Sequence, residues 1–225
     1  MNDHESMLRA DLCEVAHRLY LDGFMSASEG NLSSLLNENE VLVTPTGICK
    51  GFLKPDQIVK MDRQGKQLSG DLPPTTEAAM HLAAYEERPQ VKAVIHCHPP
   101  FLNAFSVAGL ILPAGVLPEF EVLFGGTLPV ADYATPGTSA LADSIRKIIH
   151  NPEHDLVILD HHGVLAVGQD ANQAAIKIEY AESTARVIYY ARQLGSVLPL
   201  PKAELAPLRE IHQKMKNSEN QLLRR

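Results

Sequence analysis

Hydrophobic residues recur at helical spacing along several stretches of the chain. Near its start, Leu8, Leu12, Val15 and Leu19 follow one another three or four positions apart, and Gly23 supplies a stop signal. Later, Pro99-Pro100 opens a helix, because proline is tolerated in a first helical turn. The same spacing predicts the remaining helices over these ranges: Glu77–Glu87, Pro100–Val107, Ser139–Ile149 and Ala171–Leu194.

Short apolar runs bounded by turn residues predict the strands. One run, Val91-Lys92-Ala93-Val94-Ile95, leads directly into a histidine and has the pattern of a buried strand. The other runs are Glu40–Thr44, Leu156–Asp160 and Val164–Val167. Because helices and strands are interspersed and some strands are adjacent, the chain is predicted to be α/β, a mixed or antiparallel central sheet flanked by helices.

Two segments lack such a pattern. Residues 108–138 are rich in glycine and proline and are expected to be a looser stretch, while the polar residues after Pro201 are expected to form a mobile tail. We therefore place one domain at residues 1–200 and the tail at residues 201–225.

Composition and charge exclude several classes of function. A chain of 225 residues with 45% hydrophobic content can bury the core of one domain. Its net charge of -7 is dispersed without a basic block, which argues against nucleic acid and membrane surfaces as partners. Three cysteines without a CxxC pair, a charged N-terminus and no long apolar run favour a soluble cytoplasmic protein.

Three short pieces carry the candidate chemistry: Pro74-Thr75-Thr76-Glu77, His96-Cys97-His98 and His161-His162-Gly163. Histidines two positions apart on a strand share one face, so His96 and His98 can hold one metal ion, while Cys97 turns to the other face and into the core. An isolated pair of this kind is more often two ordinary histidines. On sequence grounds, either His161 or His162 can be the third ligand, and Asp160 can accept a hydrogen bond from a neighbouring imidazole.

The carboxylate and the turns around it suggest an anion site. Glu77 opens a predicted helix, where free amide N–H groups attract phosphate and where Thr75 and Thr76 add hydroxyls. Two further turns of small residues, Ser28-Glu29-Gly30-Asn31 and Thr44-Pro45-Thr46-Gly47, can add donors. Taken singly, each of these turns is most often only a turn.

Six motifs occur in one order and spacing, and together they resemble the class II aldolase/adducin family, typified by L-fuculose-1-phosphate aldolase. The resemblance extends from about Leu8 to Leu194 and rests on these pieces: Ser28-Glu29-Gly30-Asn31, Thr44-Pro45-Thr46-Gly47, Thr75-Thr76-Glu77, His96-x-His98, Tyr133-Ala134-Thr135-Pro136-Gly137-Thr138 and His161-His162-Gly163. It implies a three-layer fold and a homotetramer with sites at subunit interfaces, for which Ala108–Phe124 is a candidate interface segment.

The resemblance also implies roles for single residues. Zn²⁺, or another divalent metal such as Mn²⁺ or Co²⁺, would be held by His96, His98 and His162, with Glu77 as a ligand at rest and as the catalytic base. The residues that match the phosphate cradle are Gly30, Asn31, Thr46, Gly47, Thr75 and Thr76, with threonine in place of the family's usual serine at the last two.

The implied activity is a lyase that cleaves a 2-keto sugar 1-phosphate to dihydroxyacetone phosphate and an aldehyde through a metal-stabilised enediolate. Two alternatives are a decarboxylase of a 3-oxo sugar-acid phosphate on the same site and a non-catalytic adducin-like binding module. The binding module is disfavoured because it has no need for three histidines and a carboxylate.

One half of the implied site departs from the family. Aldolases of the fuculose type carry a tyrosine, contributed by a neighbouring subunit, that protonates the aldehyde oxygen. Here the matching stretch, Val116-Leu117-Pro118-Glu119-Phe120-Glu121, has no tyrosine, and no aromatic residue follows Tyr190. Glu119, Glu121 and Tyr133 are the candidates to replace it.

Overall fold

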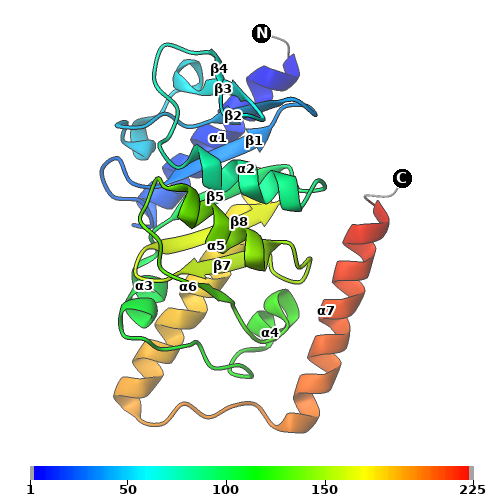
Figure 1. Ribbon diagram of the computed structural model, residues 1–225. Helices are drawn as coiled ribbons and strands as arrows, with labels where there is room; N and C mark the ends of the chain where they lie inside the picture. The colour runs from blue at the N-terminus through cyan, green and yellow to red at the C-terminus, as the bar shows by residue number, and fades with distance from the viewer. Residues whose placement is uncertain (1–2, 223–225) are drawn as a thin grey trace.

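A mixed eight-stranded sheet forms the middle of the molecule in the computed structural model, which describes residues 3–222 (Figure 1). The strand order is β4-β3-β2-β1-β5-β8-β7-β6, and only β6 and β7 run parallel. The strands are β1 (Asn31–Leu35), β2 (Glu40–Val43), β3 (Val59–Asp62), β4 (Gln67–Ser69), β5 (Ala93–Cys97), β6 (Val130–Ala131), β7 (Leu156–Leu159) and β8 (Gly163–Gly168).

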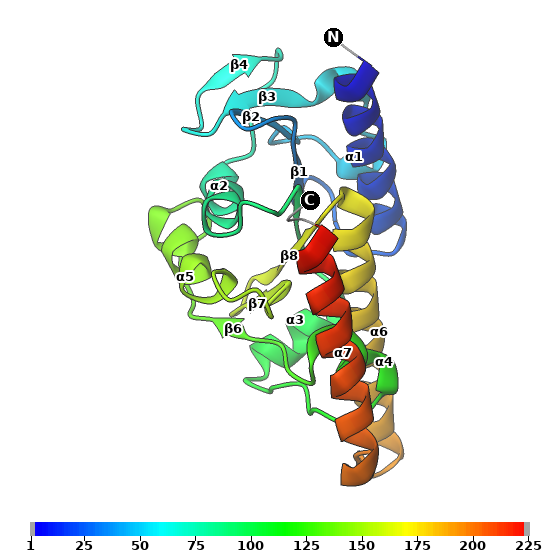
Figure 2. The same ribbon diagram turned by 90° about the vertical axis from the view of Figure 1, so that its right-hand side faces the viewer.

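Helices cover both faces of the sheet and complete three layers, as the sequence predicts (Figure 2). One face packs against α1 (Asp3–Leu21), α3 (Pro100–Val107) and α6 (Ala171–Leu194), and the other against α2 (Ala78–Glu87) and α5 (Ser139–Ile149). Alternate residues of β5 separate the two cores: Ile95 and Cys97 belong to the first and Val94 to the second. The elements outside these layers are η1 (Lys50–Phe52), η2 (Pro55–Gln57), α4 (Pro118–Phe124) and α7 (Lys202–Leu222).

Most predicted elements are present, and α3, α5 and α6 have the predicted bounds. The sequence missed β1 although it lies in the middle of the sheet, because its buried residues include Ser33 and Ser34 and no apolar alternation marks it. Within 108–138 it also missed the short helix α4. Among the described residues, no helix is long and apolar enough to cross a membrane.

The polar segment after Pro201 was expected to be a mobile tail, and this expectation is wrong for residues 202–222, which form helix α7 and pack on α4 (Figure 1). Polar contacts, rather than a stripe of apolar residues, attach α7 to the rest of the protein. His212 and Lys216 are buried, and the Lys216 ammonium donates to Pro152 O at 3.0 Å and to Asp155 Oδ2 at 2.6 Å. Residues 223–225 lie outside the described part.

Asp155 is the centre of this attachment. Its buried carboxylate pairs with Arg88 at 3.0 Å, Lys177 at 2.8 Å and Lys216 at 2.6 Å, so it joins α2, α6 and α7 to the start of β7. Burial by itself would raise the pKa of Asp155, but the charges of Lys177, Lys216 and Arg88 hold it well below the ordinary value.

We expect Asp155→Asn to lower the free energy of unfolding by about 3 kcal/mol or more at pH 7, because it leaves three cations, of which Arg88 and Lys216 are buried, without their carboxylate. The folded-state pKa is depressed, so the stabilisation is present above the unfolded pKa of about 3.9 and is lost as the pH falls below it. Urea unfolding at pH 7 and at pH 3 checks this. The difference in the free energy of unfolding between wild type and Asp155→Asn should be smaller at pH 3. Asp143→Asn, at an exposed position of α5, is the control and should change little. An equal difference in the free energy of unfolding at both pH values would contradict the assignment of an ionised, stabilising carboxylate to Asp155.

Candidate metal centre

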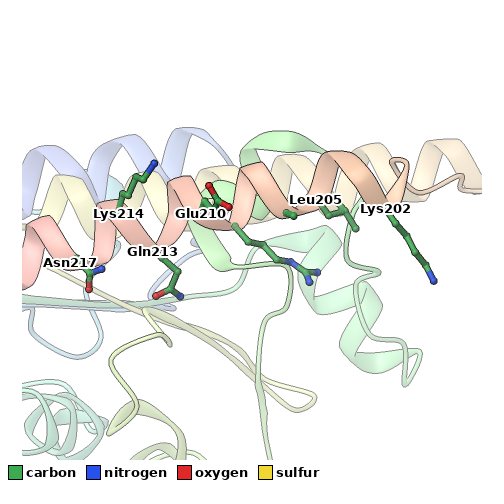
Figure 3. Close-up of a pocket in the computed structure, with 8 residues that line it drawn as sticks. Lys202, Leu205, Glu210, Gln213, Lys214 and Asn217 are labelled. Carbon is green, nitrogen blue, oxygen red and sulfur yellow. The ribbon is translucent and has the colours of Figure 1, made fainter.

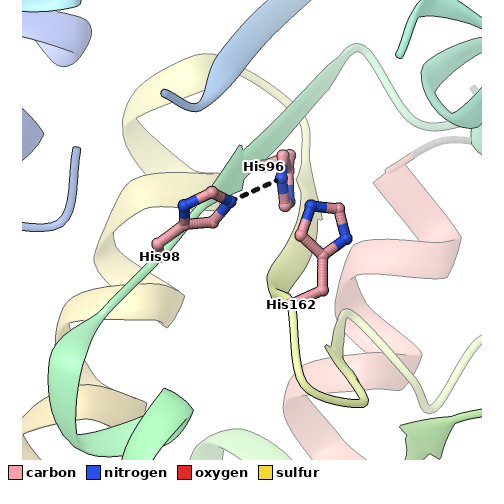
Figure 4. A group of neighbouring side chains, drawn as sticks. All are labelled: His96, His98 and His162. Atoms are coloured by element: carbon pink, nitrogen blue, oxygen red, sulfur yellow. Dashed lines mark hydrogen bonds between the residues drawn. The ribbon is translucent and has the colours of Figure 1, made fainter. Parts of the chain in front are cut away.

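Three histidines from two separate parts of the chain converge at one end of the sheet (Figure 4). His96 lies on β5, His98 follows the end of β5, and His162 lies in the turn before β8. One ring nitrogen from each lies within 4.8 Å of the others, and the Nε2 atoms of His96 and His98 are 3.1 Å apart. The pairing of β5 with β8 brings the two motifs together.

Gly163 makes this convergence possible. A Cβ atom at Gly163 would lie 2.5 Å from the Cys97 carbonyl oxygen and 2.6 Å from His98 Cδ2, which is closer than any side chain tolerates. Two positions earlier, His161 has a φ of 54°, which non-glycine residues adopt rarely. The chain therefore turns sharply here, and His162 faces the other two histidines.

The structure decides between the two candidate histidines by position. His161 is exposed and its Nδ1 donates to Asp160 Oδ1 at 2.8 Å, the contact expected of Asp160, so it is not part of the cluster. His162 is part of it. Cys97 is fully buried on the opposite face of β5, as predicted.

The hydrogen bond of the His96 ring leaves the lone pair of its other nitrogen facing the centre. His96 Nδ1 donates to the Val164 carbonyl at 2.9 Å, so its Nε2 carries no proton when the ring is neutral. Burial holds the pKa of His96 well below the ordinary value, and the neighbouring His98 and His162 lower it further. Burial also lowers the pKa of His162. Neutral imidazoles are the form that binds a metal.

Glu77 lies beside the three rings, at the N-terminal end of α2. Its Oε2 is 3.4 Å from His96 Nε2 and accepts from Asn31 Nδ2 at 2.8 Å, and its Oε1 is 3.4 Å from His162 Nε2. Glu77 Oε1 and His162 Nδ1 are buried without a hydrogen-bond partner. A carboxylate oxygen without a hydrogen bond beside three imidazoles fits a divalent cation of the Zn²⁺ type, which takes nitrogen and oxygen ligands in this number.

A cavity of about 590 Å³ opens next to the histidines, and five of the six predicted cradle residues line it: Gly30, Asn31, Thr46, Thr75 and Thr76. Gly47 follows Thr46 in the same turn but does not line the cavity. A larger hollow, of about 800 Å³, runs along α7 and is lined by residues of that helix alone, such as Leu205 and Lys214 (Figure 3).

Backbone bonds hold the two threonine turns side by side. Thr46 N donates to Pro73 O at 3.1 Å and Thr75 N donates to Thr44 O at 3.2 Å, so these two amides are used within the protein. The hydroxyl oxygen of Thr75 accepts from Glu77 N at 3.3 Å, which leaves its O–H to donate to an anion in the cavity.

Lys50 also lines the cavity, and sequence reasoning missed it. Its ammonium donates to Ser28 O at 3.1 Å and to Ile48 O at 2.7 Å, joining the two turns that carry Gly30 and Thr46. It is buried, makes no ion pair among the described residues, and burial lowers its pKa to about 8. In the sequence, a lone lysine after a turn looks like a surface residue, so only its burial reveals it.

The three candidates for a replacement acid do not line this cavity. Glu119 and Tyr133 are exposed. Glu121 is fully buried, where it accepts from Gly115 N and pairs with Arg209 of α7 at 3.2 Å. Within one chain, the carboxylate of Glu121 therefore connects α4 to α7 instead of facing the histidines.

Comparison with known proteins gives a consistent family. Residues 10–189 match the family model described as the class II aldolase and adducin N-terminal domain. The chain is 32% identical over 210 residues to the 3-oxo-tetronate 4-phosphate decarboxylase of Escherichia coli, covering 91% of this chain and 96% of that one. It is also 32% identical over 186 residues to the L-fuculose phosphate aldolase of Methanococcus maripaludis, covering 83% and 98%.

Solved structures of the same fold are similar to this chain as well. The crystal structure of YgbL from Escherichia coli superposes with a TM-score of 0.81 at 32% identity, covering 91% of this chain and 99% of that one. An L-fuculose 1-phosphate aldolase superposes with a TM-score of 0.81 at 29% identity, covering 93% and 98%.

The geometry predicts that His162→Ala abolishes stoichiometric binding of a divalent metal, because it removes one of three ring ligands. The adjacent variant His161→Ala should keep the metal and is the matched control. Elemental analysis after reconstitution with Zn²⁺ measures both, and circular dichroism confirms that both are folded. Metal loss in His161→Ala with retention in His162→Ala would reverse the assignment.

Proposed function

Since this chain belongs to the class II aldolase and adducin family, we propose that it is a divalent-metal-dependent lyase that decarboxylates a 3-oxo sugar-acid phosphate. The observation that carries the proposal is the buried Oε1 of Glu77, which has no hydrogen bond, beside three histidines at a cavity lined by threonines. The decarboxylase relatives support the choice of reaction, since their similarity extends over nearly the whole of both chains.

Each part of the site has a role in this proposal. His96, His98 and His162 hold the cation, which when bound supplies a Lewis acid for the negative charge that develops on the substrate oxygens. Thr75, Thr76 and Lys50 bind the phosphate away from the reacting carbon and so orient the substrate.

In the proposed reaction, Glu77 transfers a proton to the reacting carbon of the substrate. Loss of CO₂ breaks the bond between the carboxylate carbon and its neighbour, and the electron pair of that bond delocalises into the adjacent ketone, which gives an enediolate. The protonated form of Glu77 then delivers a proton to this carbon from Oε1, the oxygen that no protein group occupies. For a four-carbon acid the products are CO₂ and dihydroxyacetone phosphate.

The aldolase is the second candidate, and the similarity to L-fuculose phosphate aldolases favours it. Both reactions form an enediolate and use Glu77 in the same way. Aldol cleavage, however, also requires a group that takes the proton from the substrate hydroxyl as the aldehyde forms, whereas a departing carboxylate carries no proton. No tyrosine lines the cavity within the described residues, and Glu121 is engaged elsewhere. We therefore place decarboxylation first, reversing the order that the sequence favoured.

We retain Zn²⁺ as the proposed metal and a homotetramer as the proposed assembly. The binding-module alternative is disfavoured, because a protein that only binds a partner has no use for an unpaired buried carboxylate oxygen next to three imidazoles.

Product analysis decides between the two reactions. With metal-loaded protein we expect CO₂ release from 3-oxo sugar-acid phosphates to be faster than aldehyde release from 2-keto sugar 1-phosphates. Glu77→Gln should lower turnover by about a hundredfold or more, because an amide cannot carry the proton. Aldehyde formation alone would select the aldolase. No turnover of either class, with no exchange of deuterium into dihydroxyacetone phosphate, would refute the proposed function.

The lowered pKa of Lys50 leads us to expect that substrate binding depends on pH. Its ammonium is charged below its pKa of about 8 and neutral above it, so kcat/KM for a phosphorylated substrate should fall as the pH rises through that value. Lys50→Met should raise KM by about tenfold at pH 7, because a charge-assisted hydrogen bond is lost. Lys50→Arg stays charged, so its profile should lack the fall near pH 8. A fall of the same size in Lys50→Arg would exclude Lys50 as its source.

A further inference from the structure

A row of four buried polar side chains lies behind Glu77 in the protein interior. Asn31 and Ser33 stand two positions apart on β1 and share one face of the sheet, while His81 and Tyr85 are four positions apart and share one face of α2. All four are nearly or fully inaccessible to solvent, between 0% and 3% exposed. The two pairs alternate along one chain of hydrogen bonds.

The hydrogen bonds run without a break from Tyr85 on α2 to Glu77, the candidate base. Tyr85 OH lies 2.9 Å from Ser33 Oγ, and Ser33 Oγ lies 2.7 Å from His81 Nδ1. His81 Nε2 lies 2.5 Å from Asn31 Oδ1, and Asn31 Nδ2 donates to Glu77 Oε2 at 2.8 Å. Every polar side-chain atom along this row has a partner.

Chemistry fixes the direction of each bond. An ionised carboxylate only accepts, so Asn31 must present its NH₂ group to Glu77 and its carbonyl oxygen to His81. His81 must then donate from Nε2, which leaves Nδ1 to accept from the Ser33 hydroxyl. Ser33 in turn accepts from Tyr85. All donors point toward Glu77, an arrangement in which successive hydrogen bonds strengthen one another.

We propose that His81, acting through Asn31, is a positioning residue that fixes Glu77 Oε2 and leaves Oε1 as the oxygen that transfers the proton. The role of Oε1 rests on the proposed function. Both ends of the Asn31 side-chain amide are occupied, so this side chain serves the Glu77 carboxylate.

The row positions a group and does not conduct protons. Tyr85 is fully buried, so its end of the chain has no exit to solvent. Burial lowers the pKa of His81 to about 3 and raises that of Tyr85, so both remain neutral at every pH at which the protein is assayed. The direction of the bonds is therefore constant.

Nitrogen-15 NMR of histidine-labelled protein tests the bond direction without turnover. We expect His81 to be the neutral Nε2–H tautomer, with an unchanged signal between pH 6 and 9. An Nδ1–H tautomer would overturn the proposal whether or not the protein is a lyase. The outcome is thus separable from a failure of the proposed function, which the product panel on wild-type protein reveals.

Kinetics of His81 variants test positioning. His81→Leu should lower kcat by about tenfold to a hundredfold, with KM within about twofold and metal content unchanged. His81→Gln places an amide N–H near the position of Nε2 and should recover most of kcat. Tyr85→Phe, at the far end of the row, should lower kcat by less than about threefold, even if it lowers the melting temperature as much as His81→Leu does. A rise in KM without a fall in kcat, or Gln no better than Leu, would overturn the proposal.

Discussion

The close approach of Gly163 to the end of β5 is the constraint on which the site depends. Since a Cβ atom at this position would overlap the Cys97 carbonyl, only glycine lets β8 begin beside His96 and His98. That approach sets the register between β5 and β8, places His162 against the other two rings, and lets the Val164 carbonyl fix the tautomer of His96. One backbone contact therefore determines both where the three imidazoles meet and which nitrogen His96 offers.

Much of this could be predicted from the sequence. The apolar periods gave α3, α5 and α6 with their bounds, and strand alternation separated Cys97 from its neighbouring histidines. What the sequence could not indicate was polarity in the interior. Strand β1 was missed because Ser33 is buried for its hydrogen bonds, and α7 because Lys216 is anchored by Asp155. Lys50 was missed for the same reason, since periodicity counts apolar residues and does not detect a buried ammonium.

Lys50 and Glu77 line the same cavity, and they form no ion pair with each other among the described contacts. Lys50 is satisfied only by backbone carbonyls, and Glu77 keeps one oxygen without a partner, although a direct ion pair would remove both costs. Natural structures leave buried charges in this state mainly where a ligand completes them. An anionic group beside Lys50 and a cation beside Glu77 would do so within one cavity, so that a single substrate could engage both.

The half of the site that distinguishes two related reactions lies outside the rigid sheet. Everything needed to form and protonate an enediolate comes from β1, α2, β5 and the turn before β8, all within the core of one chain. The group that aldol cleavage needs in addition would come from the region of α4, and here α7 holds that region through Arg209 and Glu121. A carboxylate recruited to attach a C-terminal helix is not free to handle a substrate proton. The same ion pair therefore both attaches α7 and engages the Glu121 carboxylate, and the proposed decarboxylation is a reaction that does not need that carboxylate.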